Sequence, residues 1–256
     1  MIDELVAKTW SKKRYYRLSG QASGNEHPSI NTIASRYTGK KILEVGCGEG
    51  TKLQKIHAAH KTGIDISATA IAQAKHKIDR AIIADAENLP FPDKTYDAVL
   101  SLFSLEHFQH PQAVLREMAR VLKPGGELVI LTPNFGAPNR ASPCFTGHRA
   151  GKLLKGFLTD FCPLNSKVLN WQSVIPRSLT EDYQSDYDTL VEPYGLSLVR
   201  FLKNQKFVVK VYSTNWQMEE KGASSLQRIF RALAVLRIFP FIHWGPHLFV
   251  IAQKTV

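Results

Sequence analysis

The chain has 256 residues, of which 44% are hydrophobic and 21% are charged, and this composition is typical of a folded domain rather than a disordered or fibrous chain. Its three cysteines form no CxxC pair, which argues against a disulfide framework or a zinc site. No run of 18 apolar residues and no signal-like start occur, so we expect a cytoplasmic protein. The net charge of +11 favours nucleic acid, anionic lipid or an acidic small molecule as partner.

Residues 1–40 are expected to form a helical lead-in, in which basic residues alternate with Trp10, Tyr15 and Tyr16. From residue 41 onward, short apolar runs alternate with helix-like segments, a pattern typical of parallel strands joined by helical crossovers. Strands are expected at residues 41–45, 61–65, 80–84, 96–101 and 126–132. Helices are expected between them at residues 50–59, 67–78 and 111–122, with Pro124-Gly125-Gly126 stopping the last of these. Residues 41–132 thus form the predicted core, with ligands at the carboxyl ends of its strands.

Residues 133–193 do not continue the alternation of strands and helices. They are rich in Pro, Asn and aromatic residues and have no clear periodicity. We interpret them as an insertion that covers the acceptor side of the site. Residues 194–256 are expected to complete the core, with a helix at 194–204 and strands at 207–213 and 247–253.

Residues 214–246 form a predicted amphipathic insertion between the last two strands. Its apolar residues recur at helical spacing beside several arginines. The favoured interpretation is a core-facing helix, because most amphipathic helices bury their apolar stripe. The alternative is a surface that rests on anionic lipid or lines an apolar path for a substrate.

Three glycines, Gly46, Gly48 and Gly50, follow the first predicted strand and precede a helix. Glycines in such a turn allow a ligand to approach the backbone closely. The spacing is GxGxG, whereas the nicotinamide fingerprint GxGxxG would require glycine at Thr51. A dinucleotide oxidoreductase is therefore disfavoured.

Acidic residues occur at the ends of three successive predicted strands, at Glu44, Asp65 and Asp85. Asp65 lies 21 residues after Glu44, the approximate spacing at which a carboxylate holds a ribose in nucleotide-binding α/β folds. The next helix has a better N-cap in Ser67. Asp85, beside Ala86, is placed to accept a hydrogen bond from an adenine amino group.

The segments ILEVGCGEG, GIDIS, ADAENLPFPDKTYDAVLSLFSLEHF and VLKPGGELVILTPN resemble, in order and spacing, the motifs of class I S-adenosylmethionine-dependent methyltransferases. The resemblance covers residues 41–134. It implies an α/β fold with a doubly wound, mostly parallel, seven-stranded Rossmann-like sheet, and S-adenosyl-L-methionine as cofactor.

The resemblance also assigns cofactor-binding residues, with Asp65 holding the ribose hydroxyls and Asp85 the adenine edge. The residues that it implies are Glu44, Gly46, Cys47, Gly48, Gly50, Asp65, Ile66, Asp85, Ala86, Ser101 and Leu102. His107 follows the fourth strand and is a hypothetical general base. No metal site is predicted, because His57 and His60 share a helical face but lack a carboxylate partner.

The insertion and the closing segment GPHLFVIAQK are similar to those of methyltransferases of small molecules, lipids or surface-sugar precursors. This resemblance implies methyl transfer to oxygen of a small, sugar-type or lipid-linked acceptor, with carbon and nitrogen as rival methylated atoms. Basic segments allow a peripheral contact with anionic membrane. One alternative is an RNA methyltransferase, whose lead-in would stack bases on Trp10, Tyr15 and Tyr16. Another is a non-catalytic module that retains the cofactor fold.

Overall fold

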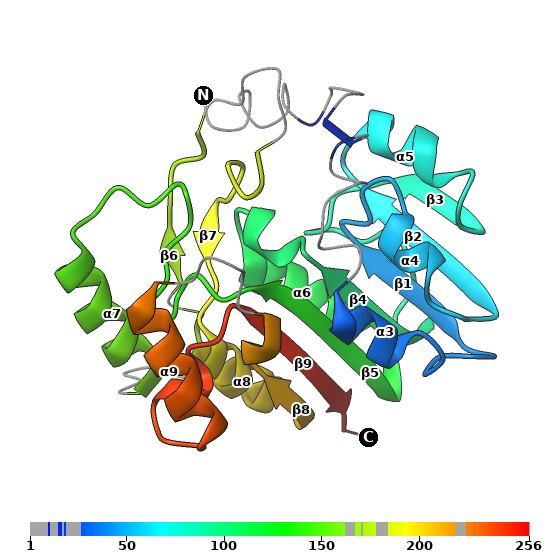
Figure 1. Ribbon diagram of the computed structural model, residues 1–256. Helices are drawn as coiled ribbons and strands as arrows, with labels where there is room; N and C mark the ends of the chain where they lie inside the picture. Colours follow the sequence, from blue (N-terminus) through cyan, green and yellow to red (C-terminus); the bar gives the residue numbers. More distant parts are fainter. Residues whose placement is uncertain are drawn as a thin grey trace.

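The computed structural model describes residues 10, 15–16, 18, 27–161, 167–169, 171–177, 184–218 and 224–255. In this part of the chain, a central sheet separates two layers of helices (Figure 1). In the predicted lead-in, Trp10, Tyr15, Tyr16 and Leu18 are helical, and residues 27–40 contain one short helix followed by turns. Cys162 lies outside the described residues.

Seven strands form the central sheet of the described chain, in the order β3-β2-β1-β4-β5-β9-β8. They are β1 (Lys41–Val45), β2 (His60–Asp65), β3 (Arg80–Ile83), β4 (Tyr96–Leu102), β5 (Leu122–Pro133), β8 (Phe207–Ser213) and β9 (His247–Lys254). Strands β1 to β5 pair in parallel, whereas β9 is antiparallel to both β5 and β8. The predicted seven-stranded, mostly parallel sheet is confirmed. Its strand order reverses between β1 and β4, where open α/β sheets bind ligands.

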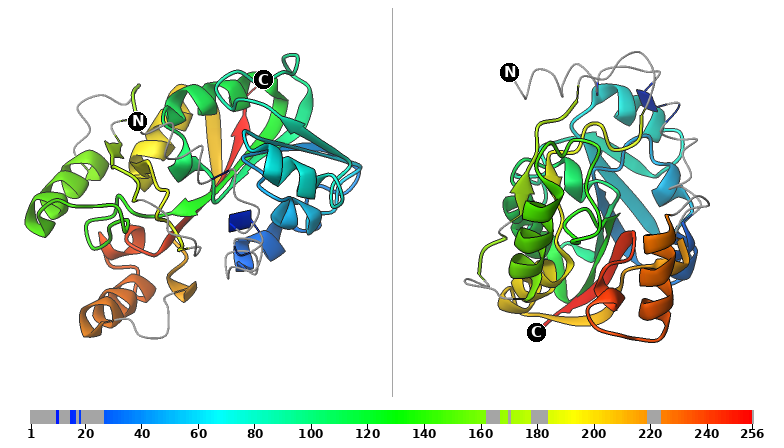
Figure 2. Two further views of the ribbon diagram at one scale, coloured as in Figure 1. Left: turned by 90° about the horizontal axis from the view of Figure 1, so that it is seen from above. Right: turned by 60° about the vertical axis from the view of Figure 1, so that its left-hand side comes forward.

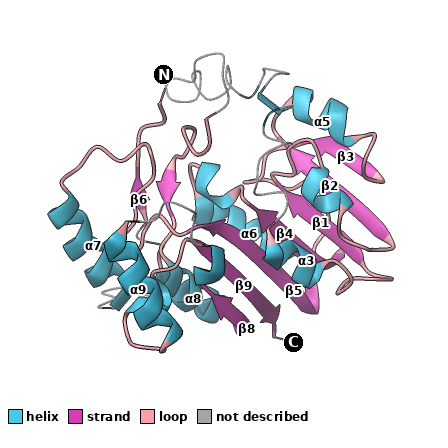
Figure 3. Ribbon diagram, in the orientation of Figure 1, coloured by secondary structure: helices cyan, strands magenta, loops and turns pink. Residues whose placement is uncertain are grey.

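Alternate residues of each buried strand face opposite helical layers, because successive side chains in a strand point to opposite faces. Ile42 and Leu100 pack against one layer, while Leu43 and Val99 pack against the other. The first layer contains α3 (Pro28–Ile33), α4 (Thr51–Gln54) and α5 (Ala68–Ala74); the second contains α6 (Pro111–Val121) and α8 (Gly195–Asn204). Figure 3 shows the resulting arrangement of helices around the sheet.

Three elements differ from the sequence expectation by several residues at one end. Helix α5, expected at residues 67–78, ends at Ala74. Helix α4 has only four residues. It ends at Gln54, because the next N–H group, that of Lys55, donates to the Lys52 and Leu53 carbonyls instead of continuing the α-helical pattern. Strand β5 begins at Leu122, directly after α6. The Pro-Gly-Gly segment therefore lies within the strand rather than between the helix and the strand. The pairing of β4 with β5 shifts register at this point, between Tyr96 and Ala98, and such irregularities are where strands tolerate Pro and Gly.

The predicted insertion, residues 133–193, contains regular elements that its composition does not predict. These are α7 (Arg149–Phe161), β6 (Gln172–Ser173) and β7 (Val191–Glu192), and the two short strands pair with each other. A buried ion pair joins Lys152 of α7 to Glu192 of β7. Asp160, near the end of α7, accepts hydrogen bonds from the Leu196 and Ser197 N–H groups of α8. The ion pair therefore ties the insertion together internally, and Asp160 fastens it to α8 of the core.

Helix α9 (Ser225–Val235) corresponds to the amphipathic stretch, but its expected burial is wrong for most of the stripe. Leu226 is 58% exposed and Ile229 is 55% exposed, while Ala234 is buried. Phe230 packs on Phe241 at a centroid distance of 5.1 Å. The short turns η3 (Trp216–Met218) and η4 (Phe241–His243) lie against the inner side of this helix, which is therefore supported on one side only.

Figures 1 and 2 place α7 and α9 away from β1, β2 and β3, on the side of the molecule where β8 and β9 lie. Within the described residues, no helix has the length and apolar character needed to cross a bilayer.

Candidate active site

The turn after β1 is built on glycines with positive φ. Gly46, Gly48 and Gly50 have φ values of 72°, 54° and 81°, a region that side-chain-bearing residues rarely adopt. A Cβ atom on Gly46 would lie 2.6 Å from the Cβ of Ser104. Cys47 contributes its backbone to this turn, because its side chain is buried in the core and its N–H donates to the Ile64 carbonyl. The turn thus presents bare backbone at the carboxyl end of β1.

Asp65 joins this glycine turn to the turn after β2. One carboxylate oxygen accepts a hydrogen bond of 2.9 Å from the Gly48 N–H, and the other accepts one of 2.9 Å from the Ser67 N–H. Burial raises the pKa of Asp65, while these two donors lower it. Each carboxylate oxygen has a further lone pair, so the group can also accept hydrogen bonds from two ligand hydroxyls.

Ser67 is the N-cap of α5, as the sequence predicts. Its hydroxyl accepts from the Ala70 N–H at 3.2 Å and donates to the Trp10 carbonyl at 2.5 Å. The same side chain therefore caps a core helix and holds the lead-in.

We expect Ser67→Ala to lower the free energy of unfolding by about 1 kcal/mol, because an N-cap acceptor is lost. Chemical denaturation of the variant and wild type measures this change. Ser35→Ala, at an exposed serine, is the control and should leave stability within about 0.5 kcal/mol. An equal loss in both variants would contradict the capping role.

Glu44 is completely buried beneath the glycine turn. Neither of its carboxylate oxygens has a hydrogen-bond partner among the described residues. Burial raises the pKa of Glu44 to about 8, although Lys52 acts in the opposite direction. Buried polar groups are rarely left without a partner, so this carboxylate indicates a ligand that brings a donor or a positive charge.

Two exposed isoleucines lie beside Asp65 at the same edge. Ile66 follows β2 and is 61% exposed, and Ile83, which is paired with Asp65 in the sheet register, is 56% exposed. Asp85 is exposed and accepts from the Glu87 N–H at 2.8 Å, whereas Ala86 is buried. An apolar surface next to carboxylates suits a flat ring with an amino group. Ile83 was not predicted from the sequence, because its place opposite Asp65 depends on strand register.

Ser101 and Leu102, at the end of β4, are both fully buried. The Ser101 and Ser104 hydroxyls are 2.7 Å apart, and Ser104 donates to the Val45 carbonyl at 2.8 Å. Leu102 packs in the core with the helices of the first layer. Ser101 and Ser104 therefore brace the carboxyl ends of β1 and β4 against each other.

These features fit a nucleoside with a positively charged amino-acid end. The glycine turn admits it close to the backbone, Asp65 can hold its sugar hydroxyls, and the isoleucines can cover its ring. The Glu44 carboxyl lies beneath the turn without a hydrogen-bond partner among the described residues, and a donor or positive charge of the ligand would favour its ionised form. The predicted residues therefore come together along the carboxyl edge of β1 to β4.

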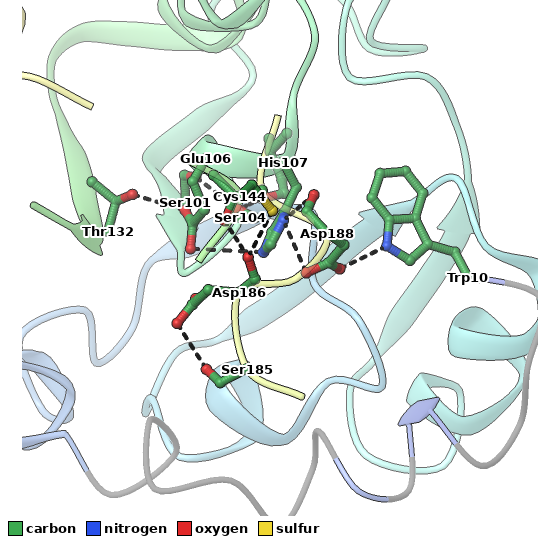
Figure 4. A network of polar contacts seen from close by, with 12 residues as sticks. Trp10, Ser101, Ser104, Glu106, His107, Thr132, Cys144, Ser185, Asp186 and Asp188 are labelled. Carbon is green, nitrogen blue, oxygen red and sulfur yellow. Dashed lines mark hydrogen bonds and ion pairs between the residues drawn. The ribbon is translucent and has the colours of Figure 1, made fainter. Parts of the chain in front are cut away.

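His107, the last residue of the turn η2 (Leu105–His107), lies among acidic groups (Figure 4). Its Nδ1 is 3.1 Å from the Asp188 carbonyl and 3.5 Å from the Asp188 carboxylate, and its Nε2 is 3.7 Å from Glu106. Burial lowers the pKa of His107, but Asp188 and Glu106 outweigh it and raise the pKa to about 9. These contacts favour the imidazolium at neutral pH. An imidazolium has no lone pair for a proton, so the geometry does not support the hypothetical base.

Asp188 connects His107 to the lead-in. Its carboxylate accepts from the Trp10 indole N–H at 3.0 Å and from the Tyr15 hydroxyl at 2.5 Å. Tyr16 is buried, and its pKa is raised by burial and by Asp65. Trp10 and Tyr15 are half-buried and hydrogen-bonded to Asp188, so base stacking on these three aromatic residues, as in the RNA alternative, stays a prediction.

Glu106 is a second acidic group that the sequence did not single out. It is buried, and one carboxylate oxygen accepts from the Thr132 hydroxyl at 2.7 Å. The other has no hydrogen-bond partner among the described residues and lies 3.7 Å from His107 Nε2. Burial raises its pKa, which His107 counteracts. Its position directly before His107 in the sequence could have identified Glu106 as a candidate site residue. For Asp188, 81 residues from His107 along the chain, no local signal existed.

A family model described as a methyltransferase domain matches residues 43–130. Over 199 residues the chain is 30% identical to the demethylmenaquinone methyltransferase of Tropheryma whipplei (strain Twist), a match that covers 75% of each protein. Over 139 residues it is 34% identical to the phosphatidylethanolamine N-methyltransferase of Cereibacter sphaeroides, covering 50% of this chain and 68% of that protein.

Among solved structures, the fold is similar to that of an S-adenosylmethionine-dependent methyltransferase from Mesorhizobium loti. The TM-score is 0.54 at 17% sequence identity, and the match covers 90% of this chain and 98% of the other. At this identity the likeness shows the shared fold.

Proposed function

Because this chain belongs to the class I S-adenosylmethionine-dependent methyltransferases, we propose that it methylates an oxygen atom of a small, sugar-type or lipid-linked acceptor. The observation that carries the choice of oxygen is the buried carboxylate of Glu106, in the turn η2 that follows β4. One of its oxygens has no hydrogen-bond partner among the described residues and lies 3.7 Å from His107 Nε2. A hydroxyl acceptor must lose a proton when it is methylated, and a carboxylate of raised pKa is suited to take it.

The cofactor, S-adenosyl-L-methionine, supplies when bound a methyl group on a sulfonium that already carries its leaving group. The chain's main task is therefore to align the acceptor with that methyl group, which can contribute roughly 7 to 11 kcal/mol in favourable cases. In this proposal Asp65 fixes the sugar and Glu44 faces the cationic end. The glycine turn sets the depth at which the nucleoside lies.

The acceptor would approach from the side of His107 and Glu106. Asp188 keeps His107 protonated, and the positive charge helps to orient a polar acceptor and offsets the neighbouring carboxylates. The Leu190 N–H donates to the Glu106 carbonyl at 2.9 Å, which fastens residues 133–193 to this side. We propose that this insertion covers the acceptor, while residues 1–40 cover the cofactor and residues 194–256 complete the core.

A lipid-linked acceptor requires access to a membrane, and a peripheral contact with anionic lipid is part of this proposal. One relative supports a lipid acceptor by name, since it is a phosphatidylethanolamine N-methyltransferase, although that name gives nitrogen as the methylated atom. The net charge of +11 agrees with anionic lipid.

A screen of methyl acceptors with cofactor labelled in the methyl group tests the proposal. Sugars, lipids, phenols and RNA are offered separately, and the methylated atom is located in each product. We expect O-methylation of a sugar, phenol or lipid hydroxyl. Labelled RNA alone, or a product methylated at carbon or nitrogen, would contradict the acceptor proposed here, and tight cofactor binding without any product would indicate a non-catalytic module.

A further inference from the structure

Exposed apolar side chains are concentrated on α7 and α9. The described residues contain fifteen large apolar side chains that are exposed, of which four lie on α7 and six lie on α9 and the residues directly after it. We call this the α7–α9 surface: Leu153, Leu154, Phe157, Leu158, Leu226, Ile229, Val235, Leu236, Ile238 and Phe239. Clustered exposure of this kind marks an interaction site rather than ordinary surface.

Aromatic contacts hold the two halves of this surface together. Phe161, at the end of α7, lies 4.9 Å from Phe157 and 4.9 Å from Phe239, measured between ring centroids. On the inner side of α9, Phe230 is 5.6 Å from Trp244. The helices that carry the outer apolar side chains are therefore packed on their inner sides. Their outer sides have no protein neighbour in the described chain, so these side chains remain exposed.

The charges around this surface are basic. Lys155, Arg228, Arg231 and Arg237 are exposed on or directly after the two helices. From residue 224 to residue 255 the sequence contains no Asp or Glu, and Asp160, the one acid of α7, is buried against α8. Among the described residues this surface is an apolar face with basic flanks and without exposed acids, which is complementary to a bilayer with anionic headgroups.

We propose that the α7–α9 surface docks on an anionic lipid bilayer, with its leucines and phenylalanines among the headgroups and its arginines on lipid phosphates. This inference locates on the protein the membrane contact that the proposed function includes. It rests on the proposed function only for the biological role of the docking. Docking would hold the acceptor side, to which α7 belongs, against the membrane.

Flotation of the full chain with vesicles tests the inference. Vesicles of phosphatidylcholine with one third phosphatidylglycerol are compared with vesicles of phosphatidylcholine alone, at low and high salt. We expect binding to the anionic vesicles that weakens with salt. Arg228→Gln with Arg231→Gln should weaken binding about 25-fold, since one basic residue near the surface contributes about fivefold, or about 1 kcal/mol.

Leu154→Ser with Phe239→Ser should weaken vesicle binding at both salt concentrations, because it removes apolar contacts. Ile175→Ser is the matched control, since Ile175 is exposed outside the α7–α9 surface, and it should bind as the wild type does. Lys40→Gln with Lys75→Gln removes two exposed charges outside the α7–α9 surface, one directly before β1 and one at the end of α5, and should have a clearly smaller effect than the arginine pair.

Several outcomes would overturn the inference. These are failure to bind anionic vesicles, equal binding by the wild type and the Leu154/Phe239 variant, self-association through this surface in sedimentation experiments, or preference for RNA over vesicles. Calorimetric titration of every variant with S-adenosyl-L-homocysteine shows whether each is folded. It also separates the two ideas, because a chain that binds vesicles but not this nucleoside would refute the proposed function alone.

Discussion

Asp65→Ala should weaken the binding of S-adenosyl-L-methionine by roughly 10²- to 10⁴-fold. A hydrogen bond to a charged group contributes about 1.5 to 3 kcal/mol, and Asp65 is placed to accept one from each ribose hydroxyl. The substitution also removes the acceptor that holds the Gly48 and Ser67 N–H groups, so the glycine turn loses its tie to the end of β2. Titration calorimetry with S-adenosyl-L-homocysteine measures the change.

Asp79→Ala is the matched control for this substitution. Asp79 also accepts a hydrogen bond from a backbone N–H of β2, that of Lys61 at 2.7 Å, but it does so near the other end of the strand. The control variant should bind the nucleoside as tightly as the wild type. If Asp65→Ala also retained wild-type affinity while remaining folded, the assignment of Asp65 to the ribose would be wrong.

His107→Gln should lower the free energy of unfolding by about 3 kcal/mol near pH 6 and by much less near pH 10. The pKa of His107 is raised from 6.5 to about 9 in the folded protein, and this difference corresponds to about 3 kcal/mol. A raised pKa contributes its full stability below the unfolded value of 6.5, and the contribution is lost as the pH rises through 9. Chemical denaturation at both pH values measures it.

His76→Gln, at an exposed histidine, serves as the control for loss of an imidazole and should leave the free energy of unfolding within about 0.5 kcal/mol of the wild type. A histidine NMR titration gives the pKa of His107 directly. A value near 9 supports an imidazolium held between Asp188 and Glu106. A value below 7 would contradict this account and would restore His107 as the hypothetical general base.

The sheet and the cofactor side of the site could be predicted from sequence because their signals are local. Buried parallel strands are short apolar runs, and Gly46, Gly48 and Gly50 mark a turn that few other residues can form. Ser67 was identifiable as a cap from its position before α5. Placing Asp65 needed only the rule that strand ends meet at one edge.

The acceptor side could not be predicted in this way, because its contacts join distant segments. Trp10 and Asp188 are 178 residues apart along the chain, and no spacing rule connects them. The stripe on α9 shows a further limit: periodicity indicates that a helix has an apolar face, but it does not show what covers that face. Helix α7 was not predicted, because the composition of the surrounding insertion is irregular.

The central claim is that a nucleoside sulfonium lies along the carboxyl edge of β1 to β4, above the glycine turn. Calorimetric titration of the purified wild-type chain with S-adenosyl-L-homocysteine, and separately with NADH, tests it most directly. The account predicts one-to-one binding of the first compound and no binding of the second. Absence of affinity for S-adenosyl-L-homocysteine in a folded protein, or preferential binding of NADH, would contradict it.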